Sequence, residues 1–263
     1  MGMYRLLLIA QKTDLGDTEA WKARKFDPVD VCADVETALA CLKTVGYHAV
    51  GAAAEEDYRR LQDALKAAGE CTPAFLLPEG EEARDRTLRE VRHLLHRLNV
   101  DYVDEPYSPQ DMSLLVQDEM IHNLLSGSSD DTEKLRYWFE MLRSDIPIDR
   151  PCRVYLLGLP EGDLYLSDRW HHGQLRLQKA LERTFFGHID DASYCAVAFL
   201  SSVESRLLLI PSGCTDVNAD MSTLDADVLR KTEEIKSYLD LNIDVYQAGT
   251  AACITDITMT NNN

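Results

Sequence analysis

The chain has 263 residues, with 27 lysines and arginines against 45 aspartates and glutamates, and its formal net charge is −18. This length suits two globular units, each large enough to bury a core of its own. Because phosphate binding needs a basic surface, we expect any contact with DNA to be made through a segment outside these 263 residues.

The cysteines and the apolar runs indicate the compartment. The seven cysteines are odd in number, widely spaced and mostly embedded in apolar runs, which is typical of buried free thiols in a reducing compartment. The first apolar run, YRLLLIA, is too short for the core of a signal peptide, and no run approaches the length of a membrane span. We therefore expect a cytoplasmic protein that makes no membrane contact.

The N-terminal half alternates strand-like runs with helical patterns. Strand-like runs occur at residues 6–10, 29–33, 48–54, 72–78 and 100–107, and helical patterns fill residues 36–46, 55–69 and 81–99. Runs such as LLLIA and AFLLP do not alternate polar with apolar residues, as expected of strands buried on both faces. The pattern predicts an α/β unit with a five-stranded parallel sheet covered by helices on both faces, whose functional positions lie beyond the carboxyl ends of the strands.

These repeats and the closing sequence DYVDEPY resemble the receiver domain of bacterial response regulators, which has a flavodoxin-like fold. In that family an acid pair after the first strand binds magnesium and an aspartate after the third strand accepts phosphate. A Ser/Thr follows the fourth strand and Lys-Pro follows the fifth. The matching positions here are Ala10 with Gln11, then Ala53, Pro78 and Glu105. The resemblance therefore implies a degenerate receiver, or pseudo-receiver.

The replaced residues remove the family's chemistry. A hard divalent cation needs oxygen ligands, which Ala10 and Ala53 do not supply. Phosphoryl transfer needs a nucleophile and positive charge around the phosphoryl oxygens, and Glu105 carries the opposite charge. We therefore expect no catalytic, metal-binding or cofactor-binding residue in this chain, no phosphorylation and no enzyme activity.

Other acids lie close to the replaced positions. Asp14 and residues 55–57 could rebuild a displaced site, but a loop or capping role for Asp14 and a helical first turn for residues 55–57 are the simpler interpretations. We expect Glu105 to be hydrogen-bonded to loop amides at the strand ends and to act as a structural latch. The peptide bond before Pro106 is a candidate cis bond.

A helix and a polar linker follow the first unit. Residues 108–127 predict a helix that completes the receiver and continues as a connector, with Met112, Leu115, Val116, Met120 and Leu124 on one stripe. The sequence SGSSDD at 126–131 is rich in small polar residues, as linkers are. We therefore expect a pseudo-receiver with its connector helix at 4–125, a linker at 126–131 and a second unit at 132–263.

The second unit reads as an α+β domain. Helical patterns occupy residues 132–147, 168–187 and 225–242, and strand-like runs occupy residues 150–162, 193–200, 205–212 and 243–251. The runs at 193–200 and 205–212 predict a central antiparallel hairpin. The order resembles the central domain of AraC-type response regulators of the YesN kind, a distant relative of GGDEF diguanylate cyclases. The hairpin turn, LSSVESR, keeps Glu204 as its only acid and has no glycine for phosphate to approach, so the resemblance implies a degenerate GGDEF-like domain without cyclase activity.

Several residues of the second half admit a functional and a structural interpretation. His171 and His172 suggest a metal site, but neighbouring residues on a helix point in different directions, so solvated histidines are the simpler interpretation. Aromatic residues at helical spacing and cysteines in strands are more often core than ligand pocket or redox site. These core candidates are Trp138, Phe139, Trp170, Cys152, Cys195 and Cys253.

Two functions remain open on this sequence. The leading hypothesis is the regulatory portion of a response-regulator-like transcription factor that signals through protein contacts and not through phosphorylation. In the family that the chain resembles, an AraC-type helix-turn-helix region follows, and these 263 residues contain none, so we expect either a truncated piece of such a protein or an incomplete relative of the family. The alternative is a small-molecule sensor in which a ligand shifts a dimer equilibrium.

A cluster of arginines suggests how the chain could meet a partner. Residues 81–98 concentrate positive charge on an acidic chain, and like copies could use this contrast to self-associate. The alternative is a solvated helix face with local ion pairs to neighbouring acids. The arginines are Arg84, Arg86, Arg89 and Arg92, and the acids are Glu81, Glu82, Asp85 and Glu90.

Overall fold

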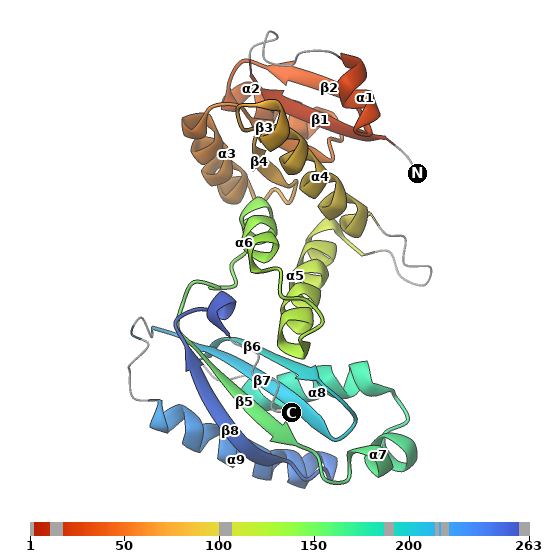
Figure 1. Ribbon diagram of the computed structural model, residues 1–263, viewed down its shortest axis with the longest axis vertical. Helices are drawn as coiled ribbons and strands as arrows, with labels where there is room; N and C mark the ends of the chain where they lie inside the picture. The colour runs from red at the N-terminus through yellow and green to blue at the C-terminus, as the bar shows by residue number, and fades with distance from the viewer. Residues whose placement is uncertain are drawn as a thin grey trace. The chain divides into compact units, whose positions relative to one another are not determined.

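The computed structural model describes residues 3–10, 18–99, 107–186, 192–213, 216 and 221–257. The chain divides into two compact units (Figure 1). Unit 1 comprises Met1–Gln117 and Glu133–Ser144, and unit 2 comprises Asp118–Thr132 and Asp145–Asn263. Most of the expected fifth strand, together with Glu105 and the bond before Pro106, lies outside the described residues.

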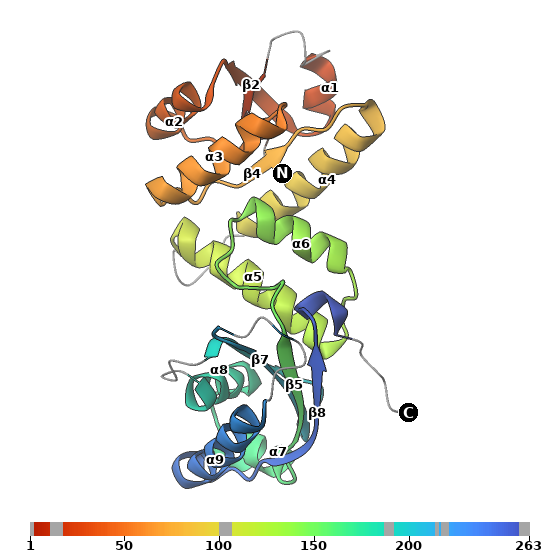
Figure 2. The same ribbon diagram turned by 90° about the vertical axis from the view of Figure 1, so that its left-hand side faces the viewer.

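Unit 1 contains a parallel sheet whose four described strands lie in the order β2-β1-β3-β4. The strands are β1 (Tyr4–Ile9), β2 (Phe26–Cys32), β3 (Ala49–Ala52) and β4 (Ala74–Leu76). The helices between them are α1 (Thr18–Ala23), α2 (Val35–Thr44), α3 (Glu55–Ala68) and α4 (Glu81–Leu98). Figure 2 shows α2 and α3 on one side of the strands and α1 and α4 on the other. The expected α/β architecture is confirmed, and α1 is a helix that the sequence patterns did not indicate.

Burial on both faces explains the unbroken apolar strand β1. Leu7 and Ile9 pack into a cluster with side chains of α2 and α3, while Leu6 and Leu8 point to the opposite face, and none of the four is more than 2% exposed. On that opposite face a Cβ added to Gly51 of β3 would approach both Leu8 and Phe75 to 2.7 Å. Because Gly51 has no Cβ, the side chains of Leu8 and Phe75 can pack directly against β3.

Local signals set the ends of the helices. The carboxylate of Asp34 accepts a hydrogen bond from the Thr37 N–H at 2.8 Å and caps the start of α2. Gly69 ends α3 with a φ of 64°, a conformation that costs glycine little. Three helices reach 18 residues, but within the described part of the chain none is both long and apolar enough to cross a membrane.

Unit 2 contains an antiparallel sheet whose four described strands lie in the order β6-β7-β5-β8. The strands are β5 (Cys152–Gly158), β6 (Ala192–Phe199), β7 (Glu204–Pro211) and β8 (Asp244–Ala251). The expected β6–β7 hairpin forms, with β7 inside the sheet and β6 at the edge of its described part. Helices α8 (Gln174–Phe186) and α9 (Ser222–Leu239) lie on the same side of the strands (Figure 2).

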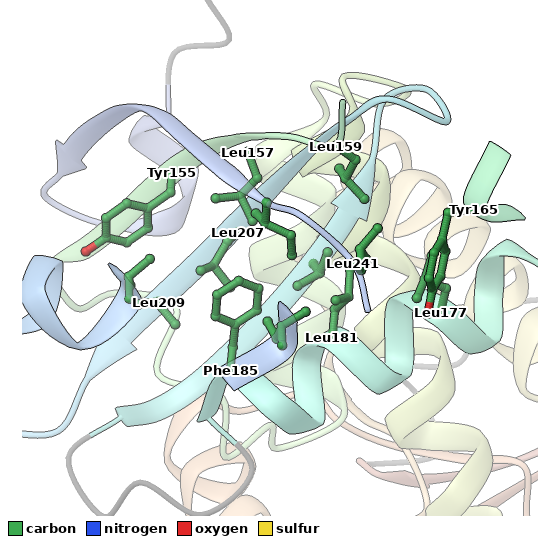
Figure 3. Close-up of a cluster of buried hydrophobic side chains, with 14 residues drawn as sticks. Tyr155, Leu157, Leu159, Tyr165, Leu177, Leu181, Phe185, Leu207, Leu209 and Leu241 are labelled. Atoms are coloured by element: carbon green, nitrogen blue, oxygen red, sulfur yellow. The ribbon is translucent and has the colours of Figure 1, made fainter. Parts of the chain in front are cut away.

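The core of unit 2 lies between the sheet and these two helices. Figure 3 shows Leu181 and Phe185 of α8 directed toward Leu157, Leu207 and Leu209 of the sheet. All five side chains are fully buried. Leu181 and Phe185 therefore lie on the inward face of α8.

The chain enters α8 later than its pattern predicted. The expected helix at 168–187 begins only at Gln174, because a short helix, α7 (Gly162–Leu164), and a π-helical turn (Tyr165–Arg169) precede it. Leu175 at the start of α8 is 77% exposed and does not join the core. The expected strand at 150–162 correspondingly ends at Gly158.

The division into units differs from the expected boundary at 126–131. Helix α5 (Pro109–Ser126) passes from unit 1 into unit 2 at Gln117, so it connects the two as expected. Helix α6 (Thr132–Met141), expected to open the second unit, instead packs with unit 1. The physical reason is that its apolar side chains, Trp138 and Phe139 among them, are buried against that unit's helices.

Candidate functional site

The carboxyl ends of the parallel strands meet at one edge of the unit 1 sheet. Ile9 at the end of β1 is paired with Cys32 of β2 and Ala52 of β3, and Ala52 is paired with Leu76 of β4. The first residues beyond the strands continue these pairings, because Ala53 N–H donates to Ile9 O at 3.0 Å. The strand ends therefore lie side by side, as expected for the receiver-like positions.

The structure brings three of the five expected positions to this edge. Ala10 follows β1 and donates its N–H to Cys32 O at 3.3 Å, Ala53 follows β3, and Pro78 lies two residues beyond β4. Gln11 and Glu105 lie outside the described residues. Two methyl groups and a proline ring offer no oxygen ligand and no nucleophile.

The acids near this edge are placed in the first turn of α3. Glu55 forms an ion pair with Arg59 at 2.5 Å, and Asp57 lies 4.0 Å from Arg60. Glu55 and Glu56 are exposed, and the expected first-turn placement is confirmed. Asp14 lies outside the described residues. In the ranges that the structure describes, no group of three or more His, Cys, Asp or Glu side chains is placed to hold a metal ion.

The β6–β7 turn of unit 2, expected to be a degenerate nucleotide loop, is docked on its own unit. The Ser202 hydroxyl donates to the Asp163 carboxylate, and Leu159 N–H donates to Val203 O at 2.8 Å. The Cα of Gly162 lies so close to Ser202 O that an added Cβ would clash with that backbone oxygen. Glu204 is the first residue of β7, and its carbonyl closes the turn by accepting the N–H of residue 200 at 2.9 Å.

His171 and His172 do not lie on a helix, contrary to the expectation from the sequence. Both are exposed in the turn that precedes α8. Trp170 stacks on Tyr165 with ring centroids 6.2 Å apart and meets the edge of His172 at 5.4 Å. Its indole N–H donates to Gly173 O at 2.9 Å. These contacts make Trp170 part of the turn's packing.

The other core candidates are buried. Trp138 and Phe139 are 4% and 3% exposed, and Cys152 and Cys253 are also buried. Burial, followed by the proximity of Cys253, raises the pKa of the Cys152 thiol to about 12. Cys195 is partly buried against the unit 2 core. The core interpretation of these residues is confirmed, and Cys152 remains a thiol at neutral pH.

A buried polar network that the sequence did not indicate joins three elements of unit 2. The Glu182 carboxylate of α8 lies 2.7 Å from Nε2 of His122 on α5 and accepts the Val197 N–H of β6 at 2.9 Å. The side chains of Glu182 and His122 are only 12% and 16% exposed. A carboxylate with several donors in such a place fixes the three elements to one another.

Two further ion pairs extend this network. Lys179 Nζ lies 3.0 Å from both the Glu182 and the Asp118 carboxylates, and the Tyr194 hydroxyl donates to Asp118 at 3.0 Å. Burial alone would raise the pKa of Glu182, but the hydrogen bonds from His122 and Val197 and the charge of Lys179 outweigh it, so the pKa lies below its ordinary value. Glu182 is therefore ionised at neutral pH.

A second polar cluster clamps α9 to the sheet. Arg153 of β5 makes a bidentate pair with Asp225 at 3.0 and 2.7 Å and donates to the Thr250 hydroxyl of β8 at 2.8 Å. Tyr155 donates its hydroxyl to the same Asp225 carboxylate at 2.7 Å. Burial, reinforced by this carboxylate, raises the pKa of Tyr155. The cluster consists of paired groups, which is the arrangement of a structural clamp.

The expected arginine cluster is divided by the fold. Arg86 and Arg89 lie exposed on α4, whereas Arg84 and Arg92 are partly buried. Asp85, expected to pair locally, instead accepts from Arg24 of the segment after α1. The exposed side of α4 therefore retains positive charge.

No protein-family model matches this chain, and none of the curated proteins matches it.

Proposed function

We propose that this chain is the regulatory portion of a response-regulator-like transcription factor, with a pseudo-receiver in unit 1 that works through protein contacts and not through phosphorylation. The observation that carries the proposal is the carboxyl edge of the parallel sheet. A parallel sheet with helices on both faces places its functional positions at that edge. Here the described positions are Ala10, Ala53 and Pro78, which can neither hold magnesium nor accept a phosphoryl group.

The strand order supports the receiver-like part of the proposal. A flavodoxin-like sheet has the order 2-1-3-4-5, and the four described strands lie in the order β2-β1-β3-β4. The fifth strand of the proposal falls on residues that the structure does not describe. The antiparallel sheet of unit 2 supports a GGDEF-like relative whose hairpin turn packs on its own unit, since Ser202 contacts Asp163 of α7 and Val203 contacts Leu159.

Phosphotransfer chemistry provides the first test. The full chain is incubated with acetyl phosphate and magnesium, and its intact mass is measured beside an active receiver domain as a positive control. We expect no mass increase, because the described edge lacks both cation ligands and nucleophile. A stoichiometric, hydroxylamine-labile adduct within the first 107 residues would overturn the pseudo-receiver assignment.

The coding sequence provides a second test. It should continue in frame into a helix-turn-helix, and a stop codon directly after Asn263 would overturn the transcription-factor assignment.

We further propose that the exposed side of α4 contributes a protein contact, with self-association as the simplest case. Arg86 and Arg89 stand out on a chain of net charge −18, so their contacts with acidic surface should weaken as salt screens them. Light scattering at low salt should show association that falls in the double variant Arg86→Glu/Arg89→Glu. A double variant of two exposed lysines with the same charge change, Lys43→Glu/Lys236→Glu, is the matched control. Equal loss in both would attribute the effect to net charge alone and overturn this contact.

A further inference from the structure

Helix α6 belongs to a different unit from the segments on either side of it. Residues Glu133–Ser144 are part of unit 1, whereas Asp118–Thr132 before them and Asp145–Asn263 after them are part of unit 2. The chain therefore leaves unit 2, supplies one helix to unit 1 and returns. A helix inserted in this way is held in unit 1 by its contacts and not by its neighbours in sequence.

The contacts of α6 are those of an amphipathic helix on a receiving surface. Its buried side chains are Leu135, Trp138, Phe139 and Met141, and Leu142 directly after the helix continues the i, i+3, i+4, i+7 spacing that begins at Leu135; each is at most 7% exposed. A ten-residue helix is marginal in water when alone, so this burial is what keeps α6 folded. The Trp138 indole N–H donates to Glu90 of α4 at 3.3 Å.

Polar contacts fix the other side of α6 to α3. The Tyr58 hydroxyl donates to the Glu140 carboxylate at 2.9 Å, and the Gln62 amide donates to the backbone carbonyl of Glu140 at 3.0 Å. Burial, reinforced by the Glu140 charge, raises the pKa of Tyr58, so the phenol remains a donor at neutral pH. These bonds set the position of α6 along α3.

Arg143 anchors the end of α6. Its guanidinium donates to Glu70 O at 2.7 Å and to Thr72 O at 2.9 Å, which are backbone carbonyls of the loop between α3 and β4. Arg143 has a φ of 52°, an unusual backbone conformation for a side chain of this size. Burial lowers the pKa of Arg143, and the backbone acceptors take the place of the lost water. Unit 1 thus presents a surface of α3, α4 and this loop, hereafter the α6-binding surface.

We propose that the α6-binding surface is exchangeable, and that the α6 of a second copy of this chain occupies it in place of the chain's own helix. The occupant follows from the structure, because a second copy carries the same Leu135, Trp138, Phe139 and Arg143. Exchange of an identical element repeats every contact and creates no uncompensated buried group. The inference does not depend on the pseudo-receiver assignment.

A labelled peptide tests whether the surface accepts a helix in trans. The probe is a fluorescein-labelled peptide of residues 132–143, and its fluorescence anisotropy is measured against the full chain and against the Trp138→Ala chain. The peptide should bind the Trp138→Ala chain saturably and the wild-type chain about tenfold or more weaker, because the intact chain's own α6 competes at high effective concentration. The same peptide carrying Trp138→Ala should lose binding.

If circular dichroism shows that the Trp138→Ala chain does not fold, the Arg143→Met chain is used in its place. It weakens the chain's own α6 at its end and leaves the apolar face intact, so it too should bind the wild-type peptide more tightly than the wild-type chain does. Failure of the peptide to bind any folded variant, or binding that does not depend on Trp138 of the peptide, would overturn the α6-binding surface.

Light scattering over a concentration series tests the occupant. The wild-type chain should form a dimer whose fraction rises with concentration and persists at high salt, since the α6 contacts named above are apolar packing and hydrogen bonds. Excess unlabelled peptide of residues 132–143 should lower the dimer fraction, because it takes the place of the second copy's α6, and the same peptide carrying Trp138→Ala should leave the fraction unchanged. A chain that binds the peptide but stays monomeric throughout, or a dimer that the peptide does not dissociate, would overturn exchange between copies.

Discussion

Glu182 is the residue on which the polar network of unit 2 depends. It is nearly buried, it lies against His122, Val197 and Lys179, and these donors hold its pKa below the ordinary value. A carboxylate with a lowered pKa in the folded state stabilises that state above the pKa of the unfolded chain. The stabilisation is lost as the pH falls through the folded-state pKa.

We predict that Glu182→Gln lowers the unfolding free energy of unit 2 at neutral pH by roughly 1–3 kcal/mol, because the buried donors lose their charged acceptor. Below about pH 4.5 the wild type should lose stability more steeply than the variant, so the difference between them should shrink. Urea unfolding followed by fluorine NMR of fluorotryptophan-labelled protein reports unit 2 through Trp170. The exposed Glu233→Gln of α9 is the control. A gap between wild type and variant that does not shrink with acid would contradict the assigned role.

The residues of this network show where sequence reasoning ends. Asp118 and His122 lie four residues apart on α5, and Lys179 and Glu182 lie three apart on α8, so each pair shares a helix face. The two pairs meet across 60 positions of sequence. No local pattern carries that information, because it depends on how α5 and α8 meet β6. By contrast, the chemistry missing at Ala10, Ala53 and Pro78 could be read directly from the residue types.

At the scale of elements, the docking of the β6–β7 turn depends on a close backbone approach. A Cβ on Gly162 would clash with the Ser202 carbonyl oxygen, whereas a Cβ on Gly249 of β8 would meet no atom within 4 Å. Both glycines belong to unit 2, and neither has a positive φ. They therefore form a matched pair for the same substitution.

We predict that Gly162→Ala destabilises unit 2 by about 1–3 kcal/mol or more, since a backbone carbonyl cannot move aside as a flexible side chain can. Gly249→Ala should be neutral or slightly stabilising, because alanine restricts the unfolded chain. Urea unfolding monitored at Trp170 compares the two variants. Equal stability of both would show that the turn does not pack against α7 as described.

Most elements were predictable because their signals are local. Strand β1 is an unbroken apolar run, α3 has acids in its first turn and Gly69 at its end, and the β6–β7 hairpin is two strand-like runs joined by a short turn. The π-helical turn at Tyr165–Arg169 was missed because its five residues have the same composition as an ordinary helix start. The start of α8 was therefore placed too early.

At the scale of the whole molecule, the main difference from expectation is the unit to which α6 belongs. The polar sequence at 126–131 reads as a domain linker, and α6 follows it directly. The small polar residues of a linker indicate that the segment is exposed, but they do not indicate which unit the following helix packs against. The unit against which α6 packs depends on the contacts of Trp138 with α4 and of Arg143 with the loop between α3 and β4, which no pattern within α6 reveals.

Unfolding of the two units should reveal this division directly. In fluorotryptophan-labelled protein the signal of Trp138 should change together with that of Trp21 in unit 1 and separately from that of Trp170 in unit 2. Leu65→Ala in the unit 1 core should shift the first two signals to lower urea, and Leu209→Ala in the unit 2 core should shift the third. Each cavity should cost about 2–5 kcal/mol. If the Trp138 signal instead changed at the same urea concentration as that of Trp170, α6 would unfold with unit 2, contrary to this division.

The insertion of α6 also affects the order in which the units can fold during synthesis and where the gene can be divided. Unit 1 is completed only when residue 144 has been added, although its sheet is encoded far earlier. A ribosome must therefore release part of unit 2's sequence before unit 1 can close. A gene fragment ending in the linker at 126–131 would encode a first unit without the helix that covers α3 and α4. Recombination at that linker would separate unit 1 from one of its own helices. The coding regions of the two units must therefore be transferred together if unit 1 is to keep α6.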